Sequence, residues 1–165
     1  MYIDDTAAIT PTQLRSRCRQ LKMDKGLDLV VVDYLGLMRA DGKTENRQLE
    51  VSEISRQLKA IALELKIPIV ACAQLSRANK DRIDKRPMLS DLRDSGSIEQ
   101  DADVVMFLHR EEYYNKETED KNIGEVIVSK QRSGPLGTVK LAWLSEYTTF
   151  ANLAADQGPS GGAPF

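Results

Sequence analysis

The stretch LDLVVVDYLGLM, residues 27–38, decides the fold of this chain. Within it, Leu29 to Val32 form a continuous run of aliphatic residues, a pattern typical of a strand buried on both faces. Asp33 follows directly. A buried strand that carries a carboxylate to the carboxyl edge of a parallel sheet has the form of a Walker B element, which organises Mg²⁺ beside nucleotide phosphates. A strand that ends on a turn-capping aspartate fits the same residues.

The residues that follow predict a second strand parallel to the first. Apolar residues recur at helical spacing from about Gln48 to Leu65, and the next apolar run, Ile69 to Ala73, reads as another buried strand. A strand, a helix and a strand with short connections form a βαβ unit, which implies parallel pairing. Gln74 then lies at the same sheet edge as Asp33, where its amide can sense a γ-phosphate. A solvent-facing residue at a strand end is the alternative.

The flanking segments complete the predicted elements. Thr10 and Pro11 predict the start of a helix that runs to about Asp24. A third strand is predicted at Val104 to Leu108, and a β-hairpin at Glu125 to Lys130 and Val139 to Leu144. Polar loops are predicted at 40–46, 77–91 (a mobile loop) and 110–121, and the Gly- and Pro-rich residues 154–165 are predicted to be a disordered tail.

Two further motifs suit anionic ligands. In LRDSGSIEQDADVV, residues 92–105, the segment Arg93–Gly96 is predicted to be a short polar loop that clamps a phosphate, followed by a helical turn. In SKQRSGPLGT, residues 129–138, Lys130 and Arg132 are two apart on a strand and therefore share one face. Such a pair suits an arginine finger that reaches an anion across an interface. A solvated turn and ordinary surface charge are the respective alternatives.

The sequence lacks a Walker A motif, the phosphate-binding partner of a Walker B strand. Gly42, Lys43 and Thr44 match its last three letters, but Leu37 stands where its first glycine belongs, and the triplet follows the Asp33 strand instead of preceding it. We therefore expect the chain alone to bind ATP weakly or not at all and to have no ATPase activity.

Composition excludes several classes of protein. The net charge is −2, so the chain is not a strongly basic nucleic-acid binder, although a few residues per copy in a multi-copy ring remain compatible. Cys18 and Cys72 have no metal-site spacing and there is one histidine, which argues against a zinc site or a disulfide framework and fits a reducing cytoplasm. No apolar run is long enough to span a membrane, and the N-terminus lacks signal-peptide features.

Taken together, these segments resemble the bacterial replicative helicases of the DnaB type. VVVDYLGLM, ENRQLEVSEISRQLKAIALEL, PIVACAQLSR, KRPMLSDLRDSGSIEQDADVVMFLHREEYY and SKQRSGPLGTV occur in the family's order, and the resemblance runs from about Tyr2 to Leu153. It implies an α/β fold of the RecA-like type: a mainly parallel sheet flanked by helices, with a C-terminal β-hairpin, and without the P-loop half. Residues 1–153 would be the C-terminal portion of the ATPase domain.

The resemblance also implies an activity and its residues. The parent would be a cytoplasmic homo-hexamer that hydrolyses ATP with Mg²⁺, translocates 5′ to 3′ on single-stranded DNA, and meets a primase and a helicase loader. Asp33 would hold Mg²⁺ and Gln74 would couple the γ-phosphate to the DNA. Lys130 and Arg132 would reach the neighbouring subunit's ATP. The DNA-contacting residues would be Arg93, Asp94 and Gly96.

Some features depart from the family pattern. The N-terminal scaffold, the P-loop and the carboxylate that activates the attacking water are missing, and Gly36 stands where the family often carries Gln, a change we expect to be tolerated. Met1 directly before YIDD suggests a truncated or partial sequence, whose missing strands would leave an unpaired edge and exposed apolar surface. The alternatives are another RecA-like ATPase, such as a recombinase or a radA-type relative, and a non-enzymatic module that caps a helicase ring.

Overall fold

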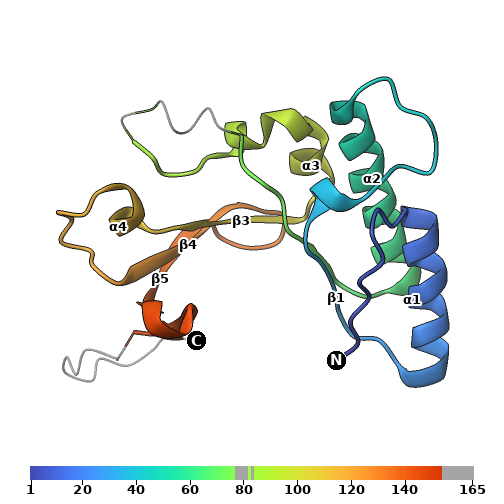
Figure 1. Cartoon of the computed structure of the whole chain (residues 1–165), viewed down its shortest axis with the longest axis horizontal. Coiled ribbons are helices and arrows are strands. Elements are labelled where there is room, and N and C mark those ends of the chain that lie inside the picture. The colour runs from blue at the N-terminus through green and yellow to red at the C-terminus, as the bar shows by residue number, and fades with distance from the viewer. Residues whose placement is uncertain (77–81, 83, 154–165) are drawn as a thin grey trace.

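The computed structural model describes residues 1–76, 82 and 84–153, with residues 93–96 described by their backbone alone. Helices and strands alternate through the first half of the chain, and strands dominate the second half (Figure 1). In chain order the elements are α1 (Pro11–Lys25), β1 (Val30–Val32), η1 (Leu35–Leu37), α2 (Arg47–Leu65), β2 (Ile69–Ala71), η3 (Leu89–Ser95), α3 (Gly96–Asp101), β3 (Val104–His109), α4 (Glu111–Tyr114), β4 (Ile123–Gln131), β5 (Gly137–Leu144), η4 (Ser145–Tyr147) and β6 (Thr149–Asn152).

The two long helices begin and end at local sequence signals. The side chain of Thr10 caps α1 by accepting from the Gln13 backbone N–H, and the Gln13 side chain accepts from the Thr10 N–H in return. Pro11 occupies the first turn of α1, as predicted. The side chain of Asn46 caps α2, which ends at Lys66 in the left-handed conformation.

The predicted βαβ unit is confirmed. β1 and β2 pair in parallel, with Val30 opposite Ile69 and Val32 opposite Ala71, and α2 lies between them in the chain. One face of α2 packs against this strand pair and against α1, and Figure 1 shows the two helices side by side. The core at this junction is aliphatic. Its buried members are Cys18, Leu35, Met38, Ile54, Leu58, Ile61, Leu65 and Ile67.

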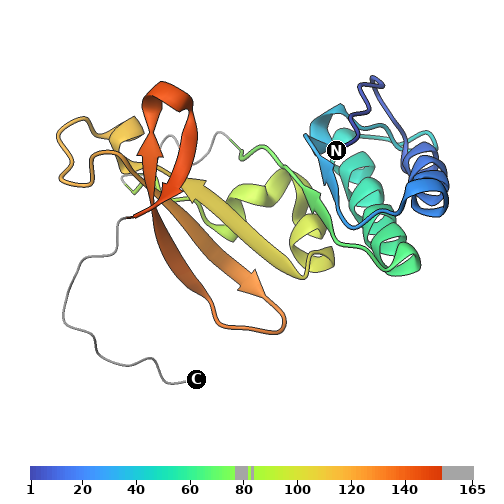
Figure 2. The ribbon, with the colours of Figure 1, turned by 90° about the horizontal axis from the view of Figure 1, so that it is seen from below.

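The third predicted strand belongs to a different sheet from the first two. β3 pairs antiparallel with β4, and the hydrogen-bonded order of the second sheet is β3-β4-β5-β6. The hairpin of β4 and β5 is confirmed and continues into β6, which the sequence did not reveal. The α/β class is confirmed, but among the described strands the parallel sheet has two members and the antiparallel sheet four, and Figure 2 shows the two sheets apart.

Three predicted loops contain helical turns. Leu89–Ser95 is a 3₁₀ helix, so the predicted loops at 77–91 and at Arg93–Gly96 are wrong at these positions. The physical reason is that Leu92 is buried in a cluster with two β3 residues and Leu89 packs against that cluster, so a helical turn supplies an apolar face. The charged segment 110–121 contains α4. Residues 77–81 and 83 and the predicted tail at 154–165 lie outside the described residues.

The expected exposed apolar surface is present along both sheets. Val31 is 59% exposed and Val70 is 44% exposed, so the prediction that these strands are buried on both faces is wrong. On β3, Met106 and Leu108 are also exposed, while Val105 and Phe107 on the opposite face are buried. The chain therefore covers one face of each sheet and leaves apolar side chains on the other. Among the described helices, none is long and apolar enough to cross a membrane.

Candidate functional site

The predicted carboxylate and amide lie at the same end of the parallel strands. The pairing of Val32 with Ala71 continues past the strands, because the Cys72 N–H donates to the Val32 carbonyl and the Leu35 N–H donates to the Cys72 carbonyl, both at 2.9 Å. Asp33 therefore lies between two inter-strand hydrogen bonds, and Gln74 follows two residues after Cys72. Both side chains are exposed. The shared sheet edge, predicted from the sequence, is confirmed.

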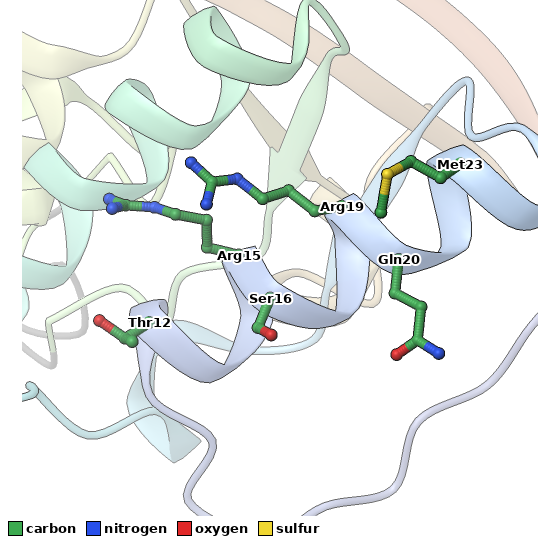
Figure 3. Close-up of a pocket in the computed structure, with 6 residues that line it drawn as sticks. All are labelled: Thr12, Arg15, Ser16, Arg19, Gln20 and Met23. Atoms are coloured by element: carbon green, nitrogen blue, oxygen red, sulfur yellow. The ribbon is translucent and has the colours of Figure 1, made fainter.

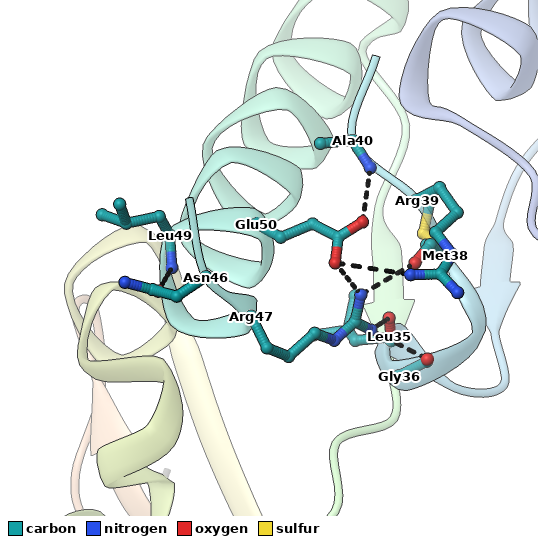
Figure 4. Close-up of polar contacts among 9 residues, drawn as sticks. All are labelled: Leu35, Gly36, Met38, Arg39, Ala40, Asn46, Arg47, Leu49 and Glu50. Atoms are coloured by element: carbon teal, nitrogen blue, oxygen red, sulfur yellow. Dashed lines mark hydrogen bonds and ion pairs between the residues drawn. The ribbon is translucent and has the colours of Figure 1, made fainter. Parts of the chain in front are cut away.

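An arginine–glutamate pair that the sequence analysis missed holds the turn after Asp33. Arg47, in the first turn of α2, donates to the carbonyls of Gly36 at 2.8 Å and of Leu35 and Met38 at 3.3 Å, and it is ion-paired with Glu50 (Figure 4). Glu50 in turn accepts from the Ala40 N–H at 3.2 Å. Backbone groups of an irregular turn need partners when they are buried. The pair supplies them and fixes the segment that follows Asp33.

The charge of Glu50 is maintained by its neighbours. Burial alone would raise the pKa of this carboxyl, but hydrogen bonds from Arg47 and Ala40 and the positive charges of Arg47 and Arg39 outweigh burial, so the pKa lies below its usual range. Figure 4 shows Glu50 aimed into the turn between these donors. The residue is 8% exposed, so the interaction is partly protected from solvent screening.

Gly36 makes room for the ring of Tyr34. A Cβ placed at position 36 would overlap the edge of that ring, which lies over the glycine. The conflict involves only a side chain, and the backbone at Gly36 is not in the left-handed region. A longer residue at this position, such as the Gln that the family often carries, therefore requires the Tyr34 ring to turn away.

The site fits Mg²⁺ only as part of a larger set of ligands. Within the described residues, no group of three or more His, Cys, Asp or Glu side chains is placed to hold a metal ion. Mg²⁺ in nucleotide sites uses one or two carboxylates together with phosphates and water, so a single exposed Asp33 fits that role. A shallow hollow runs along α1 instead, lined by Thr12, Arg15, Ser16, Arg19, Gln20 and Met23 (Figure 3). Neither Asp33 nor Gln74 lines it.

Lys130 lies near the end of β4, and Arg132 lies just after it, so the prediction that both share a strand holds for Lys130 only, yet both side chains reach the same helix. Both donate to the carbonyl of Gln100 at the end of α3, Lys130 at 3.3 Å and Arg132 at 2.9 Å. Lys130 also donates to the carbonyl of Glu99, and Arg132 lies 3.5 Å from an Asp103 carboxylate oxygen. The pKa of Asp103 is lowered, chiefly by its hydrogen bond from Lys59, which outweighs partial burial. The positive charges of Lys59, Arg132 and Lys130 lower it further. In this structure both cations contact their own chain.

The predicted DNA-contacting residues lie in the helical segment η3–α3. Arg93 and Asp94 belong to η3, and Gly96 is the first residue of α3. Both short helices pack against α2, so the segment is anchored to the βαβ unit. The side chains of Arg93 and Asp94 are outside the description, and the ligand roles of all three residues stay predictions.

These features define an α/β protein in which parallel strands end in a carboxylate and an amide, the class that binds ligands at the carboxyl edge of its sheet. Comparison with known proteins gives the family. Residues 1–152 match the model of the DnaB-like helicase C terminal domain, so the chain belongs to this family. The structure has a TM-score of 0.84 and 48% identity to a solved ATPase domain, covering 88% of this chain and 52% of that one.

Related proteins are considerably longer than this chain. It is 58% identical over 154 residues to the replicative DNA helicase DnaB of Geobacillus stearothermophilus and 57% identical to the replicative DNA helicase DnaC of Bacillus subtilis. Each match covers 93% of this chain and 34% of the relative. A solved DnaB-like replicative helicase, described with its interactions with primase, has a TM-score of 0.88 and 48% identity over 92% of this chain and 38% of that one. The chain thus spans about a third of the curated relatives' length.

Replacing Glu50 with Gln is expected to lower the free energy of unfolding at neutral pH by about 1 kcal/mol, the typical net contribution of such a hydrogen bond. Because the folded-state pKa of Glu50 is lowered, its contribution is present above the ordinary glutamate range and is lost as the pH falls through the folded-state pKa. The difference between the wild type and Glu50→Gln should therefore shrink on acidification. Urea denaturation over a pH series measures it.

Glu53→Gln on the same helix is the matched control, because Glu53 forms an ion pair with Arg56 and accepts a hydrogen bond from Gln57, both neighbours on α2 that lie outside the turn. It is expected to change the free energy of unfolding little at any pH. Equal effects of the two substitutions at neutral pH would contradict the role given to Glu50.

Proposed function

We propose that this chain is part of the motor of a replicative DNA helicase that couples ATP hydrolysis to 5′ to 3′ translocation on single-stranded DNA and to duplex unwinding. One observation carries the proposal: the family match extends over residues 1–152 and includes the sheet edge with Asp33 and Gln74. Its relatives are named as replicative DNA helicases. The match favours this function over that of other RecA-like ATPases.

In the nucleotide site, this chain supplies two groups. Asp33 would hold Mg²⁺ through its exposed carboxylate, and Mg²⁺–ATP would supply the phosphoryl group that is hydrolysed. Gln74, which follows β2 at the same end of the parallel strands, hydrogen-bonds the γ-phosphate without adding charge. The Arg47–Glu50 pair keeps the turn after Asp33 in place, which limits the reorganisation needed when nucleotide binds.

Lys130 and Arg132 act on the ATP bound by the neighbouring subunit of a homo-hexamer. Their partners within the chain are two backbone carbonyls and the exposed Asp103. A phosphate accepts stronger, charge-assisted and often bidentate hydrogen bonds from arginine than a neutral carbonyl does. Exchange of the Gln100 carbonyl for a phosphate is therefore favourable when a neighbouring subunit presents ATP.

Arg93, Asp94 and Gly96 contact the backbone of single-stranded DNA from the η3–α3 segment. Arg93 pairs with a phosphate, and the backbone N–H groups near Gly96 add neutral donors. A net charge of −2 fits this arrangement, because a ring needs only a few cations per copy. A primase and a helicase loader are the further partners of the parent, in keeping with the solved relative described with primase.

The chain alone is expected to show no ATPase activity, because its sequence has no Walker A loop to bind the phosphates. Purified chain is assayed for phosphate release with ATP, Mg²⁺ and single-stranded DNA, beside the Arg132→Ala variant. Background rates in both fit the proposal. Steady hydrolysis by the wild type that is lost in Arg132→Ala would show that the chain forms a working site by itself and would contradict it.

Single-stranded DNA binding tests the role of Arg93. Arg93→Ala is expected to weaken binding of a fluorescent oligonucleotide equally for different base sequences, because a phosphate contact carries no sequence information. The slope of log affinity against log salt should fall by about 0.7, the value for one phosphate contact on a single strand. Fluorescence anisotropy at several salt concentrations measures both effects.

Arg56→Ala is the control for that experiment, since it removes one cation from an exposed face of α2, where Arg56 pairs with Glu53. A loss of affinity equal to that of Arg93→Ala would indicate non-specific electrostatic attraction. A loss confined to one base sequence would contradict a backbone contact.

A further inference from the structure

Asp91 is a buried carboxylate at which several chain segments meet. It lies in η3 and is 2% exposed. Its two carboxylate oxygens accept hydrogen bonds from the two terminal nitrogens of Arg82, both at 2.8 Å, and one of them also accepts from the Met88 N–H at 2.9 Å. A buried carboxylate needs such complete pairing, because an unpaired charge in the interior is strongly destabilising.

Arg82 extends this pairing into the segment before η3. It donates to the carbonyl of Arg86 at 2.8 Å and to that of Asp84 at 3.3 Å. Arg86 then forms an ion pair with Glu125 of β4, with its two terminal nitrogens at 3.0 and 3.2 Å from the carboxylate oxygens. Two arginine–carboxylate pairs therefore tie the segment before η3 to η3 itself and to the second sheet.

The backbone of Asp91 connects η3 to the segment after β2. The Ser76 N–H donates to the Asp91 carbonyl at 2.9 Å, and Leu75 packs against the buried cluster that contains Leu92. Gln74 immediately precedes Leu75 and Ser76 in the segment that follows β2, and Arg93 immediately follows Leu92. Among the described residues, the link between the segment after β2 and η3 includes one hydrogen bond to the Asp91 carbonyl and one apolar contact beside it. The carboxylate of Asp91 is held by Arg82.

We propose that Asp91 is a positioning residue that holds the segment after β2, which carries Gln74, and the Arg93 turn of η3 in one fixed relation, so that a displacement of either is imposed on the other. The nucleotide and DNA roles of the two segments rest on the proposed function. The connection itself rests on the hydrogen bonds at Asp91, and none of them includes a group that contacts nucleotide or DNA.

The test compares Asp91→Asn with wild type in the full chain by amide hydrogen exchange and NMR. Asparagine keeps the size of the side chain but loses the charge that holds Arg82. The expected result is faster exchange at the Ser76 amide and shifted backbone resonances at Gln74 and Arg93, with α1 and α2 unchanged. A merely structural role of Asp91 would lower the melting temperature without this residue-specific pattern of exchange and resonance shifts.

A second measurement is the affinity for a fluorescent oligothymidylate. Asp91→Asn is expected to weaken binding roughly fivefold, the ratio that corresponds to about 1 kcal/mol for one positioning hydrogen bond. Arg82→Lys, which keeps the charge but loses the two-pronged contact, should give a smaller loss. Adding Arg82→Met to Asp91→Asn should cost little more than Asp91→Asn alone, because both act through one contact. Arg56→Met is the control for the positive charge that Arg82→Met removes.

The outcomes separate this proposal from the proposed function. If Asp91→Asn is folded and changes exchange only at Met88 to Leu92, leaving Ser76 and Gln74 unaffected, the positioning role is overturned. If Asp91→Asn does not fold, Arg82→Lys gives the same exchange readout, because its side chain is partly exposed. If wild type does not bind the oligothymidylate, the DNA role fails, and exchange at Ser76 decides the positioning role by itself.

Discussion

The parallel pairing of β1 with β2 is the constraint on which the rest of the structure depends. It is held by the aliphatic face of α2, whose Ile54 and Ile61 are fully buried beneath the two strands. Because the pairing is parallel, both strands end at one edge, and the hydrogen bonds at Cys72 extend it past the regular strands. Asp33 and Gln74 owe their common position to this geometry and not to any direct contact between them.

The irregular segments around this edge use one physical device twice. The turn after Asp33 is held by Arg47 and Glu50, and the segment leading to η3 is held by Arg82 and Asp91. In each case a poorly exposed carboxylate fixes an arginine, and the arginine donates hydrogen bonds to backbone carbonyls of the irregular segment. Such pairs add little stability beyond that of an apolar core, and here they hold the segments that carry or adjoin the residues predicted to function.

Local patterns predicted the local structure well and the long-range structure less well. Thr10 and Pro11 predict the start of α1, and the helical spacing of apolar residues before Leu65 predicts α2, because caps and periodicity act within a few residues. That β3 joins β4 in a separate antiparallel sheet depends on strand partners far along the chain. The sequence predicted Asp91 to be one polar residue in a charged loop, because no pattern in the neighbouring residues shows that its carboxylate will be buried. The prediction of helicase function rested on the chain-long resemblance and not on any single motif.

The most direct test of the account replaces the matching third of the Geobacillus stearothermophilus helicase with residues 1–152 of this chain and measures DNA-stimulated ATP hydrolysis by the chimera. The account predicts an active chimera whose hydrolysis falls to background on Asp33→Asn and is unchanged by Asp28→Asn, an exposed aspartate just before β1. A chimera that assembles but does not hydrolyse ATP, or one that stays active with Asp33→Asn, would contradict the account.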